Sequence, residues 1–326
     1  MNILITGITG MVGSHLADYI LENHPEHEVH GFTLWQTPFD NIQHILSRIT
    51  LHYGDLRDLN SLVEALRESK PDWIFHLAAQ SYVPYSFTAP AETLGTNVIG
   101  TTTLLDAMRI TGCDAKVHVC SSSEVYGQVR EDEVPITENN PFRPASPYAV
   151  SKVGEDMVAL QYFLSYGIKT VRTRMFTHTG PRRGDVFAES AFAKQIAEVE
   201  AGVRQNPIKV GNLASVRTIA DVRDATRAYW LLMEKCPPGE VYNIGGDRTM
   251  TIGELLEILK GMATCKIEHE VDPALLRPSD VTLQIPDSSK FKAITGWKPE
   301  IPAEQTLGDL LDYQRERVRE QTRGLR

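Results

Sequence analysis

The chain has 326 residues, of which 42% are hydrophobic and 23% are charged, and these proportions exclude collagen-like, disordered and disulfide-scaffold proteins. The formal net charge of −9 opposes non-specific binding to nucleic acid or to an anionic membrane. The four cysteines are widely spaced, which favours free thiols in a reducing cytoplasm over disulfides or a cysteine-based zinc site: Cys113, Cys120, Cys236 and Cys265.

The apolar run at the N-terminus is too short for a targeting or membrane segment. It stops after Ile5 and no basic stretch precedes it, so we expect a buried strand there rather than a signal peptide. The longest uncharged stretch, residues 73–91, is interrupted by Pro84 and Pro90. We therefore expect no membrane span in this stretch.

Short apolar runs alternate with helical patterns through the first half of the chain. The runs are partly β-branched, as expected of strands buried on both faces, and they cover residues 2–6, 28–33, 49–53, 73–77, 116–120 and 169–174. The helical patterns cover residues 11–23, 59–69, 92–111 and 146–166. This alternation predicts an α/β protein with a Rossmann-like, doubly wound parallel sheet.

Beyond about Phe176 the elements become shorter and are separated by prolines and glycines, which predicts a smaller C-terminal lobe. Within this half, residues 216–219, 220–235 and 241–244 have the patterns of one more strand, helix and strand that return to the sheet. We therefore expect a first domain of residues 1–176 plus the return segment 216–245. The second lobe would then comprise residues 177–215 and 246–326.

A glycine-rich turn joins the first predicted strand to the first predicted helix. Its glycines permit a tight turn, let backbone N–H groups approach a pyrophosphate and let the helix pack on the strand, while the helix N-terminus favours negative charge. A tight turn without a ligand is the alternative, but the position between strand and helix favours a dinucleotide site. The expected coenzyme contacts are Gly7, Thr9, Gly10, Met11, Val12 and Gly13.

The end of the second predicted strand bears on the choice between NAD and NADP. NAD sites usually have an acidic residue there, whereas NADP sites have an arginine near the 2′-phosphate. The segment from Gly31 to Gln36 has neither, and no Lys or Arg occurs from Gly31 to Leu46. This composition favours NAD over NADP, with Thr33 at the strand end among the coenzyme contacts.

Tyr148 and Lys152 are four residues apart, so they share one face of the predicted helix 146–166. A nearby ammonium group stabilises a phenolate, which lowers the pKa of Tyr148 towards neutrality and makes it a general base or acid. The strand 116–120 runs into Ser122 and Glu124 at the sheet edge where doubly wound folds bind ligands. In isolation, the Tyr and Lys could be an exposed helix pair; the glycine turn and this strand end favour catalysis.

These motifs together resemble the extended short-chain dehydrogenase/reductase superfamily of nucleotide-sugar enzymes. They are the glycine turn, the S-S-E-V-Y-G strand end at residues 122–127, the Y-x-x-x-K helix and the downstream arginines. Within that superfamily the chain is most similar to GDP-mannose 4,6-dehydratases and GDP-4-keto-6-deoxymannose reductases, from Asn2 to about Tyr313. The resemblance implies an NAD(P)-dependent enzyme whose first domain binds the coenzyme and whose second lobe binds a GDP-sugar.

The resemblance also implies roles for single residues. Tyr148 is the base that takes the proton of the sugar 4-hydroxyl, Lys152 supports it and anchors the ribose, and Ser122 hydrogen-bonds the same oxygen. Glu124 is the additional base that a 4,6-dehydratase needs at C5, although it could instead cap a turn. Further coenzyme contacts are implied for Asp55, Leu56, Leu77, Ala78 and Ala79. Substrate contacts are implied for Gln80, Ser86, Ser123, Thr177, Arg182, Arg217 and Arg277.

Arg217 and Arg277 match positions that grip the nucleotide diphosphate, for which a planar guanidinium is suited. Surface ion pairs are the structural alternative for both arginines.

We expect a nucleotide-sugar 4,6-dehydratase that acts on GDP-mannose by oxidation at C4, deprotonation at C5, loss of water from C6 and return of the hydride. NAD(P)H-dependent 4-reduction of GDP-4-keto-6-deoxymannose stays open, because Ser122 stands where dehydratases usually have Thr. Epimerisation at C4 stays open too, because Thr177 is typical of uronate-sugar 4-epimerases. A coenzyme-binding regulatory protein without turnover is the alternative from another class, and the retention of Ser122, Tyr148 and Lys152 opposes it.

His24, His27 and His30 suggest a metal site at first sight. They straddle the end of a predicted helix and the start of a predicted strand, so we expect their side chains to diverge and to bind no metal.

The helix from Ser146 to Tyr166 has an apolar stripe at helical spacing, formed by Val150, Val153, Met157, Leu160 and Leu164. Superfamily members commonly pair this helix with its copy in a second subunit. The resemblance therefore implies a homodimer.

Overall fold

The computed structural model describes residues 1–324; residues 325 and 326, the end of the expected second lobe, lie outside the described part. Its largest element is a seven-stranded sheet in the order β11-β6-β5-β4-β1-β2-β3, in which each strand runs parallel to its neighbours. The predicted doubly wound α/β fold is confirmed. The strands are β1 (Asn2–Thr6), β2 (Glu28–Thr33), β3 (Thr50–Tyr53), β4 (Trp73–His76), β5 (Lys116–Ser122), β6 (Thr170–Met175) and β11 (Val241–Ile244).

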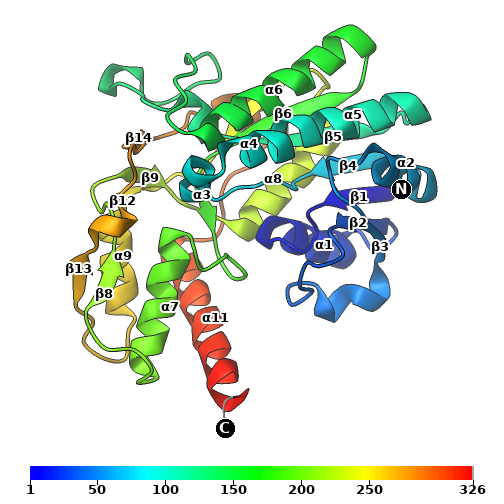
Figure 1. The fold of residues 1–326 in the computed structure, drawn as a ribbon. Helices are drawn as coiled ribbons and strands as arrows, with labels where there is room; N and C mark the ends of the chain where they lie inside the picture. The colour runs from blue at the N-terminus through cyan, green and yellow to red at the C-terminus, as the bar shows by residue number, and fades with distance from the viewer. Residues whose placement is uncertain (325–326) are drawn as a thin grey trace.

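Helices cover both faces of this sheet (Figure 1). One face carries α2 (Leu59–Ser69), α5 (Gly100–Thr111) and α6 (Pro147–Tyr166), with the short α3 (Val83–Thr88) and α4 (Pro90–Leu94) beside α6. The other face carries α1 (Met11–Asn23), α8 (Val222–Lys235) and α10 (Ser289–Thr295). None of the helices within residues 1–324 is long and apolar enough to cross a membrane.

The strands are apolar because each of them contributes to two cores. Ile3 and Ile5 pack in the core that includes α1 and α8, whereas Leu4 between them packs in the core that includes α2 and α5. This alternation follows from the two-residue period of a strand, and burial on both faces explains the unbroken hydrophobic run.

The second lobe has a core of its own (Figure 1). Its helices are α7 (Ala188–Glu200), α9 (Ile252–Gly261) and α11 (Ala303–Gly324). Its short strands form three small sheets: β7 (His178–Thr179) with β10 (Ala220–Asp221), β8 (Ile208–Val210) with β13 (His269–Val271), and β9 (Val216–Thr218) between β12 (Thr249–Thr251) and β14 (Leu283–Gln284). The core residues include Phe192, Ile196, Leu255, Leu259, Leu307 and Leu310.

Two local predictions need correction. The strand at 216–218 belongs to the small sheet of β12 and β14, so only α8 and β11 of the expected return segment pack on the large sheet. The predicted helix 92–111 is divided into α4, a π-helical turn η2 (Gly95–Ile99) and α5. Hydrophobic periodicity reports neither which sheet a strand joins nor a widened helical turn, because both depend on contacts with distant segments.

The sheet brings the expected functional segments to one edge. The chain leaves β1 and β4 at their carboxyl ends on opposite sides of the point where the strand order reverses, and ligands of such sheets bind in that crevice. The serine-rich end of β5 continues into a 3-10 turn, η3 (Ser123–Tyr126), beside the same crevice. Other 3-10 turns are η1 (Gln43–Arg48), η4 (Glu131–Glu133) and η5 (Pro273–Leu275).

Candidate active site

One cleft of about 1190 Å³ lies at the carboxyl edge of the large sheet and is lined by residues of both lobes. It contains the four residues expected to react, namely Ser122, Glu124, Tyr148 and Lys152. The expected coenzyme residues line it as well: Gly7, Thr9, Gly10, Met11, Val12, Gly13, Thr33, Asp55, Leu56, Leu77, Ala78 and Ala79. So do most of the expected substrate residues: Gln80, Ser123, Thr177, Arg182, Arg217 and Arg277.

Ser86 is the exception. Its side chain is fully buried, and its hydroxyl donates to the backbone oxygen of Val83 over 2.6 Å within α3. Ser86 is not among the residues that line the cleft, so its substrate contact stays a prediction. A serine on a short helix can bond to its own preceding turn, which the sequence position alone does not reveal.

The glycine turn is shaped by close backbone approaches. Gly7 has a φ of +72°, and a Cβ added to it would lie 2.9 Å from Cα of Ala78. A Cβ on Gly13 would lie only 2.3 Å from the carbonyl oxygen of Gly7. Gly10 is the N-cap of α1 and provides no side-chain cap, so the first N–H groups of this helix are free to meet an anion. These residues fit the pyrophosphate of a dinucleotide.

Short polar contacts shape the adenine end expected beyond β2. The Thr33 hydroxyl, buried at the strand end, lies 3.4 Å from that of Thr9, and Asn41 donates to the backbone oxygen of Thr9 over 2.9 Å. Arg57 also lines the cleft, and its Nη2 lies 2.6 Å from Oδ2 of Asp55. The side-chain hydrogen bond from this arginine holds the pKa of Asp55 below its usual value, against a smaller effect of burial. The Arg57 guanidinium and the Asp55 carboxylate therefore form an ion pair with each other.

Helix α6 fixes the Tyr and Lys pair. The helix begins after Ser146, whose hydroxyl accepts from the backbone N–H of Ala149 over 3.0 Å, and Pro147 occupies its first turn. This start places Tyr148 and Lys152 one above the other, both buried at the wall of the cleft. Ser122, at the end of β5, hydrogen-bonds with the Tyr148 side chain. The predicted grouping of these three residues is therefore present.

The pKa of Tyr148 is raised, whereas the sequence predicted a pKa lowered towards neutrality. Burial raises the pKa of its phenol, and the opposing effects of the Lys152 ammonium and the Ser122 hydrogen bond do not fully offset this rise. The ammonium is itself bound by the carboxylate of Glu155, which reduces its influence on the phenol. The spacing of Tyr148 and Lys152 revealed their proximity but could not reveal this second charge.

Glu124 lies in η3, two residues after Ser122, and lines the same cleft. Burial raises the pKa of its carboxyl, and Arg217 and Arg277 oppose this rise. Its backbone N–H donates to the Ser122 hydroxyl over 3.2 Å, so the turn after β5 holds the two residues in a fixed relation. A carboxyl whose pKa is raised by burial holds a proton more readily than an exposed carboxyl, which suits a group that takes up and releases a proton.

Arg217 and Arg277 meet around one carboxylate. Nη2 of Arg217 lies 4.0 Å from Asp280 Oδ1, and Nη1 of Arg277 lies 3.6 Å from the same atom. Arg217 is buried, and its guanidinium also donates to the backbone oxygens of Val216 and Val281. Asp280 and Glu124 both lie near these two guanidinium groups, whose planar N–H donors suit a diphosphate.

The two neighbouring arginines of the G-P-R-R-G segment behave differently. Arg182 has a φ of +66°, and its Nη1 donates to Oδ2 of Asp18 on α1 over 2.6 Å. Arg183, which was not among the expected site residues, is half-buried, and its guanidinium carbon lies 3.6 Å from the centre of the Phe187 ring. Burial lowers the pKa of Arg183, whereas Glu189 and Tyr148 oppose this effect. Its adjacency to Arg182 was the only signal in the sequence.

Gln284 is another cleft residue that the sequence did not suggest. It lies in β14, is buried, and accepts a 2.8 Å hydrogen bond from the Ser123 hydroxyl through Oε1. Ser123 and Gln284 are 161 residues apart, so no local motif joins them. Gln80, in contrast, was expected as a substrate contact and lines the cleft, but its amide bonds to Tyr82 and Thr93.

The histidines near the end of α1 do not all diverge. Potential ligand atoms of His24, Glu26 and His27 lie within 4.8 Å of one another, contrary to the expectation. The ring of His24 stacks on Trp230 at 3.8 Å between centroids, and His27 stacks against the same indole. This aromatic packing accounts for the grouping. His30 does point elsewhere, because its ring contacts His52 at 3.0 Å.

Comparisons with known proteins place this cleft in a family. A family model described as GDP-mannose 4,6 dehydratase matches residues 4–310. The chain is 34% identical to a GDP-6-deoxy-D-mannose reductase from Pseudomonas aeruginosa, over 98% of this chain and 99% of that protein. It is 32% identical to a GDP-mannose 4,6-dehydratase from Yersinia enterocolitica, over 94% of this chain and 92% of the relative.

Solved structures agree in fold. The structure of RMD from Pseudomonas aeruginosa, complexed with NADPH, superposes with a TM-score of 0.85 at 33% identity and covers 98% of this chain and 100% of its own. A dTDP-glucose 4,6-dehydratase from Bacillus anthracis, in complex with NAD, has a TM-score of 0.84 at 26% identity and covers 98% of each chain. Neighbours of this fold therefore hold either coenzyme.

Proposed function

This chain belongs to the GDP-mannose 4,6-dehydratase family, and we propose on that premise that it converts GDP-mannose to GDP-4-keto-6-deoxymannose. The observation that carries the proposal is that Glu124 lines the same cleft as Ser122 and Tyr148 and is held next to Ser122 by the turn after β5. A 4,6-dehydratase needs a base beyond the tyrosine, because it must remove a proton at C5 as well as one from the 4-hydroxyl.

Different side chains of the chain carry out the different proton transfers of the reaction. A nicotinamide coenzyme, when bound along the glycine turn, supplies hydride acceptance and return. The Lys152 ammonium stabilises the phenolate form of Tyr148, which then takes the proton of the sugar 4-hydroxyl and becomes a neutral phenol, while Ser122 hydrogen-bonds the same sugar oxygen. Glu124 takes the C5 proton and delivers it to the 6-hydroxyl, which then leaves as water. Burial of this carboxyl keeps bulk water from competing for the proton.

The charged groups at the far end of the cleft hold the rest of the substrate. We assign the nucleotide diphosphate to Arg217 and Arg277, whose guanidinium groups converge on Asp280. Gln80, Ser123, Thr177 and Arg182 line the space between these arginines and the glycine turn, and we assign them to the sugar. Binding energy from the diphosphate then orients C4 and C5 towards the reacting side chains.

A 4-reductase is the second candidate, because the relative from Pseudomonas aeruginosa is named as a reductase and matches almost the full chain. Incubation of the protein with GDP-mannose and catalytic NAD or NADP, followed by mass spectrometry, tests the choice. We expect a product lighter by one water. An unchanged substrate, with stoichiometric NAD(P)H oxidation on GDP-4-keto-6-deoxymannose, would assign the reductase, and a product of unchanged mass with an inverted C4 would assign an epimerase.

Glu124→Gln isolates the step that separates these reactions. The amide keeps the size of the side chain but cannot take the C5 proton, so we expect oxidation at C4 to survive and water loss to fall about 100-fold. Transient nicotinamide absorbance reports the first step, and product mass reports the second. Normal water loss in this variant would refute the role of Glu124 as the C5 base.

We propose NAD as the preferred coenzyme. The segment from Gly31 to Leu46 carries no cation, and the guanidinium of Arg57 is paired with Asp55. A 2′-phosphate would have to break that pair to gain a cation. Mass spectrometry of the coenzyme released from freshly purified protein tests this preference, and bound NADP would contradict it.

We also propose a homodimer that assembles through α6. Three large apolar residues on this helix are exposed, namely Val150 by 46%, Met157 by 37% and Leu164 by 70%, and Ile99 at the end of η2 and Ile110 on α5 are exposed as well. Light scattering should give the mass of a dimer, and Leu164→Glu should shift it to a monomer. A monomeric wild-type protein would contradict the assignment.

Cytoplasmic localisation remains part of the proposal, supported by the four cysteines, all of which are free thiols. Cell fractionation of the source organism, with the protein recovered outside the cytoplasmic fraction, would overturn it.

A further inference from the structure

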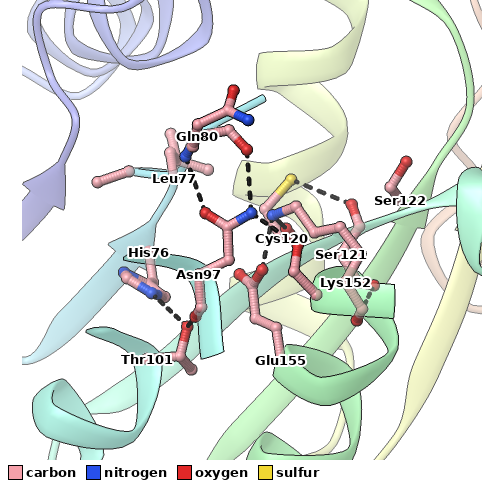
Figure 2. A network of polar contacts seen from close by, with 12 residues as sticks. His76, Leu77, Gln80, Asn97, Thr101, Cys120, Ser121, Ser122, Lys152 and Glu155 are labelled. Atoms are coloured by element: carbon pink, nitrogen blue, oxygen red, sulfur yellow. Dashed lines mark hydrogen bonds and ion pairs between the residues drawn. The ribbon is translucent and has the colours of Figure 1, made fainter. Parts of the chain in front are cut away.

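A second carboxylate lies next to the catalytic ammonium. Nζ of Lys152 donates to Oε2 of Glu155 over 2.7 Å and to the backbone oxygen of Cys120 over 2.8 Å. Figure 2 shows the ammonium between these two groups, below the segment that carries Gln80. The side chains of Lys152 and Glu155 are only 6% and 2% exposed. This pair is therefore a buried ion pair within the reacting machinery.

Two of the three N–H groups of the Lys152 ammonium already donate hydrogen bonds to fixed acceptors. Of its three N–H groups, one serves Glu155 and one serves Cys120, which leaves one for the side of the cleft where Tyr148 lies. Glu155 is one helical turn beyond Lys152, and this spacing puts both side chains on the same face of α6. The carboxylate thus fixes where the ammonium sits and also opposes its charge.

Asp156, the next residue on α6, pairs with cations other than Lys152. Asp156 accepts from Nη1 of Arg172 over 2.7 Å and from Nε of Arg174 over 2.8 Å, both on β6. These guanidinium groups satisfy Asp156 without Lys152. Among the described residues, Glu155 has Lys152 as its side-chain hydrogen-bond donor.

Three titratable groups around the ammonium, namely His76, His118 and Cys120, stay neutral near pH 7. Burial lowers the pKa of His76 on β4 and of His118 on β5 to about 3, with smaller effects of the nearby cations. Burial raises the pKa of the Cys120 thiol, so it remains protonated. Tyr148 and Asp156 on α6 itself complete the surroundings. Asp156 is paired with Arg172 and Arg174, and Arg183 also acts on Tyr148, so these charges form the fixed surroundings of Lys152, Glu155 and Tyr148.

Within the pair, the carboxyl is the group that titrates near neutrality. Burial raises the pKa of Glu155 to about 7, although Lys152 opposes the rise. Burial also disfavours the ammonium of Lys152, but the Glu155 carboxylate outweighs this effect and raises its pKa above the ordinary value. Lys152 thus stays charged while Glu155 gains or loses its proton.

We propose that Glu155 is a positioning residue that sets, through Lys152, the pH range in which Tyr148 works as a base. When Glu155 is ionised, its charge offsets that of the ammonium, and the Tyr148 phenolate is less stabilised. When Glu155 is protonated, the full charge of Lys152 acts on the phenolate. This inference rests on the role assigned to Tyr148 under the proposed function.

Glu155→Gln tests the proposal because the amide keeps the size of the side chain and an oxygen that can accept from Lys152. A unit charge about 10 Å from the phenolate at a protein-like dielectric corresponds to a pKa shift of about one unit. We therefore expect the pKa of Tyr148 to fall by about one unit. Ultraviolet titration of tyrosinate measures the pKa of Tyr148 in the purified protein without substrate. In each case the titration of the same protein with Tyr148→Phe is subtracted, so that only the signal of Tyr148 remains.

The acid limb of the turnover profile should move down by the same amount. A matched control is Glu257→Gln, since Glu257 and Lys260 form an exposed pair with the same three-residue spacing and the same 2.7 Å distance. That control should leave both titrations unchanged. An unshifted Tyr148 titration in folded Glu155→Gln would overturn the proposal.

A measurement on the unmutated side chain covers the case in which Glu155→Gln does not fold. Carbon-13 NMR of protein labelled at glutamate carboxyls follows each proton uptake directly, and Glu155→Asp removes the one signal that identifies Glu155. A carboxyl that stays ionised throughout the range around pH 7 would refute the proposal. A shifted Tyr148 titration without water loss from GDP-mannose would instead refute the dehydratase while leaving the coupling intact.

Discussion

The two halves of the cleft hold their ligands by different means. The coenzyme half is centred on one continuous turn, residues 6–13, in which closely packed backbone leaves no room for a Cβ at Gly7 or Gly13, and residues such as Thr33, Asp55 and Ala78 extend it. The sugar-nucleotide half is built from charged and polar side chains of separate segments, namely Glu124, Arg183, Arg217, Arg277, Asp280 and Gln284. Tyr148 and Lys152 lie where the two halves meet.

This difference predicts different sensitivities. Backbone N–H groups do not titrate, so the coenzyme half should respond to steric change and little to pH. The sugar-nucleotide half contains buried cations and a carboxyl whose pKa burial raises, so it should respond to charge changes, salt and pH. Substitutions in each half should therefore separate coenzyme affinity from substrate affinity.

The largest effect is expected at the junction of the two halves. Tyr148→Phe removes one hydroxyl and little volume, so we expect kcat to fall about 1,000-fold while coenzyme and GDP-mannose still bind. Turnover assays and calorimetric titration of both ligands measure this. Retained activity would remove Tyr148 from the role of base.

A steric change should disable the coenzyme half alone. In Gly13→Ala the new Cβ would lie 2.3 Å from the Gly7 carbonyl oxygen, and the turn must shift. We expect coenzyme affinity to fall about 10- to 100-fold, corresponding to roughly 1–3 kcal/mol of strain. Gly261→Ala is the matched control, because a Cβ there meets nothing within 4 Å. Equal coenzyme affinity in both variants would show that the turn does not hold the pyrophosphate.

A change of charge geometry should weaken the sugar-nucleotide half alone. Arg217→Lys keeps the positive charge but loses the planar fork that reaches two acceptors. We expect KM for GDP-mannose to rise about tenfold, with unchanged coenzyme affinity. Arg130→Lys on the exposed surface is the control. If KM is unaffected, the diphosphate does not bind at Arg217.

The smallest effect is expected at Ser86, which faces its own helix. Ser86→Ala should leave kcat and KM within about twofold of the wild type, at a stability cost of about 1 kcal/mol for the lost hydrogen bond. Kinetics combined with urea denaturation measure both quantities. A strong rise in KM would support Ser86 as a substrate contact.

The same division explains what the sequence could predict. The coenzyme half and the Tyr148 and Lys152 pair are local patterns, since glycine spacing and a four-residue helical interval act within one element. The parallel sheet followed from the alternation of apolar runs and helical patterns. These features therefore appeared in the sequence before any three-dimensional information.

The sugar-nucleotide half was only partly predictable, because its residues meet through tertiary packing. Ser123 and Gln284 are far apart in the chain, and the small sheet that holds Arg217 joins three distant segments. Glu155 was also missed. Its three-residue spacing from Lys152 was visible, but its burial, which turns an ordinary helix pair into a group that titrates near neutrality, was not.

The central claim is that one cleft oxidises C4 and then returns the same hydride to C6 of one sugar. GDP-mannose deuterated at C4 tests it directly when the product is examined by NMR and mass spectrometry. The account predicts a product lighter by water that carries deuterium at C6. Deuterium that remains at C4, or that passes into the released coenzyme pool, would contradict it.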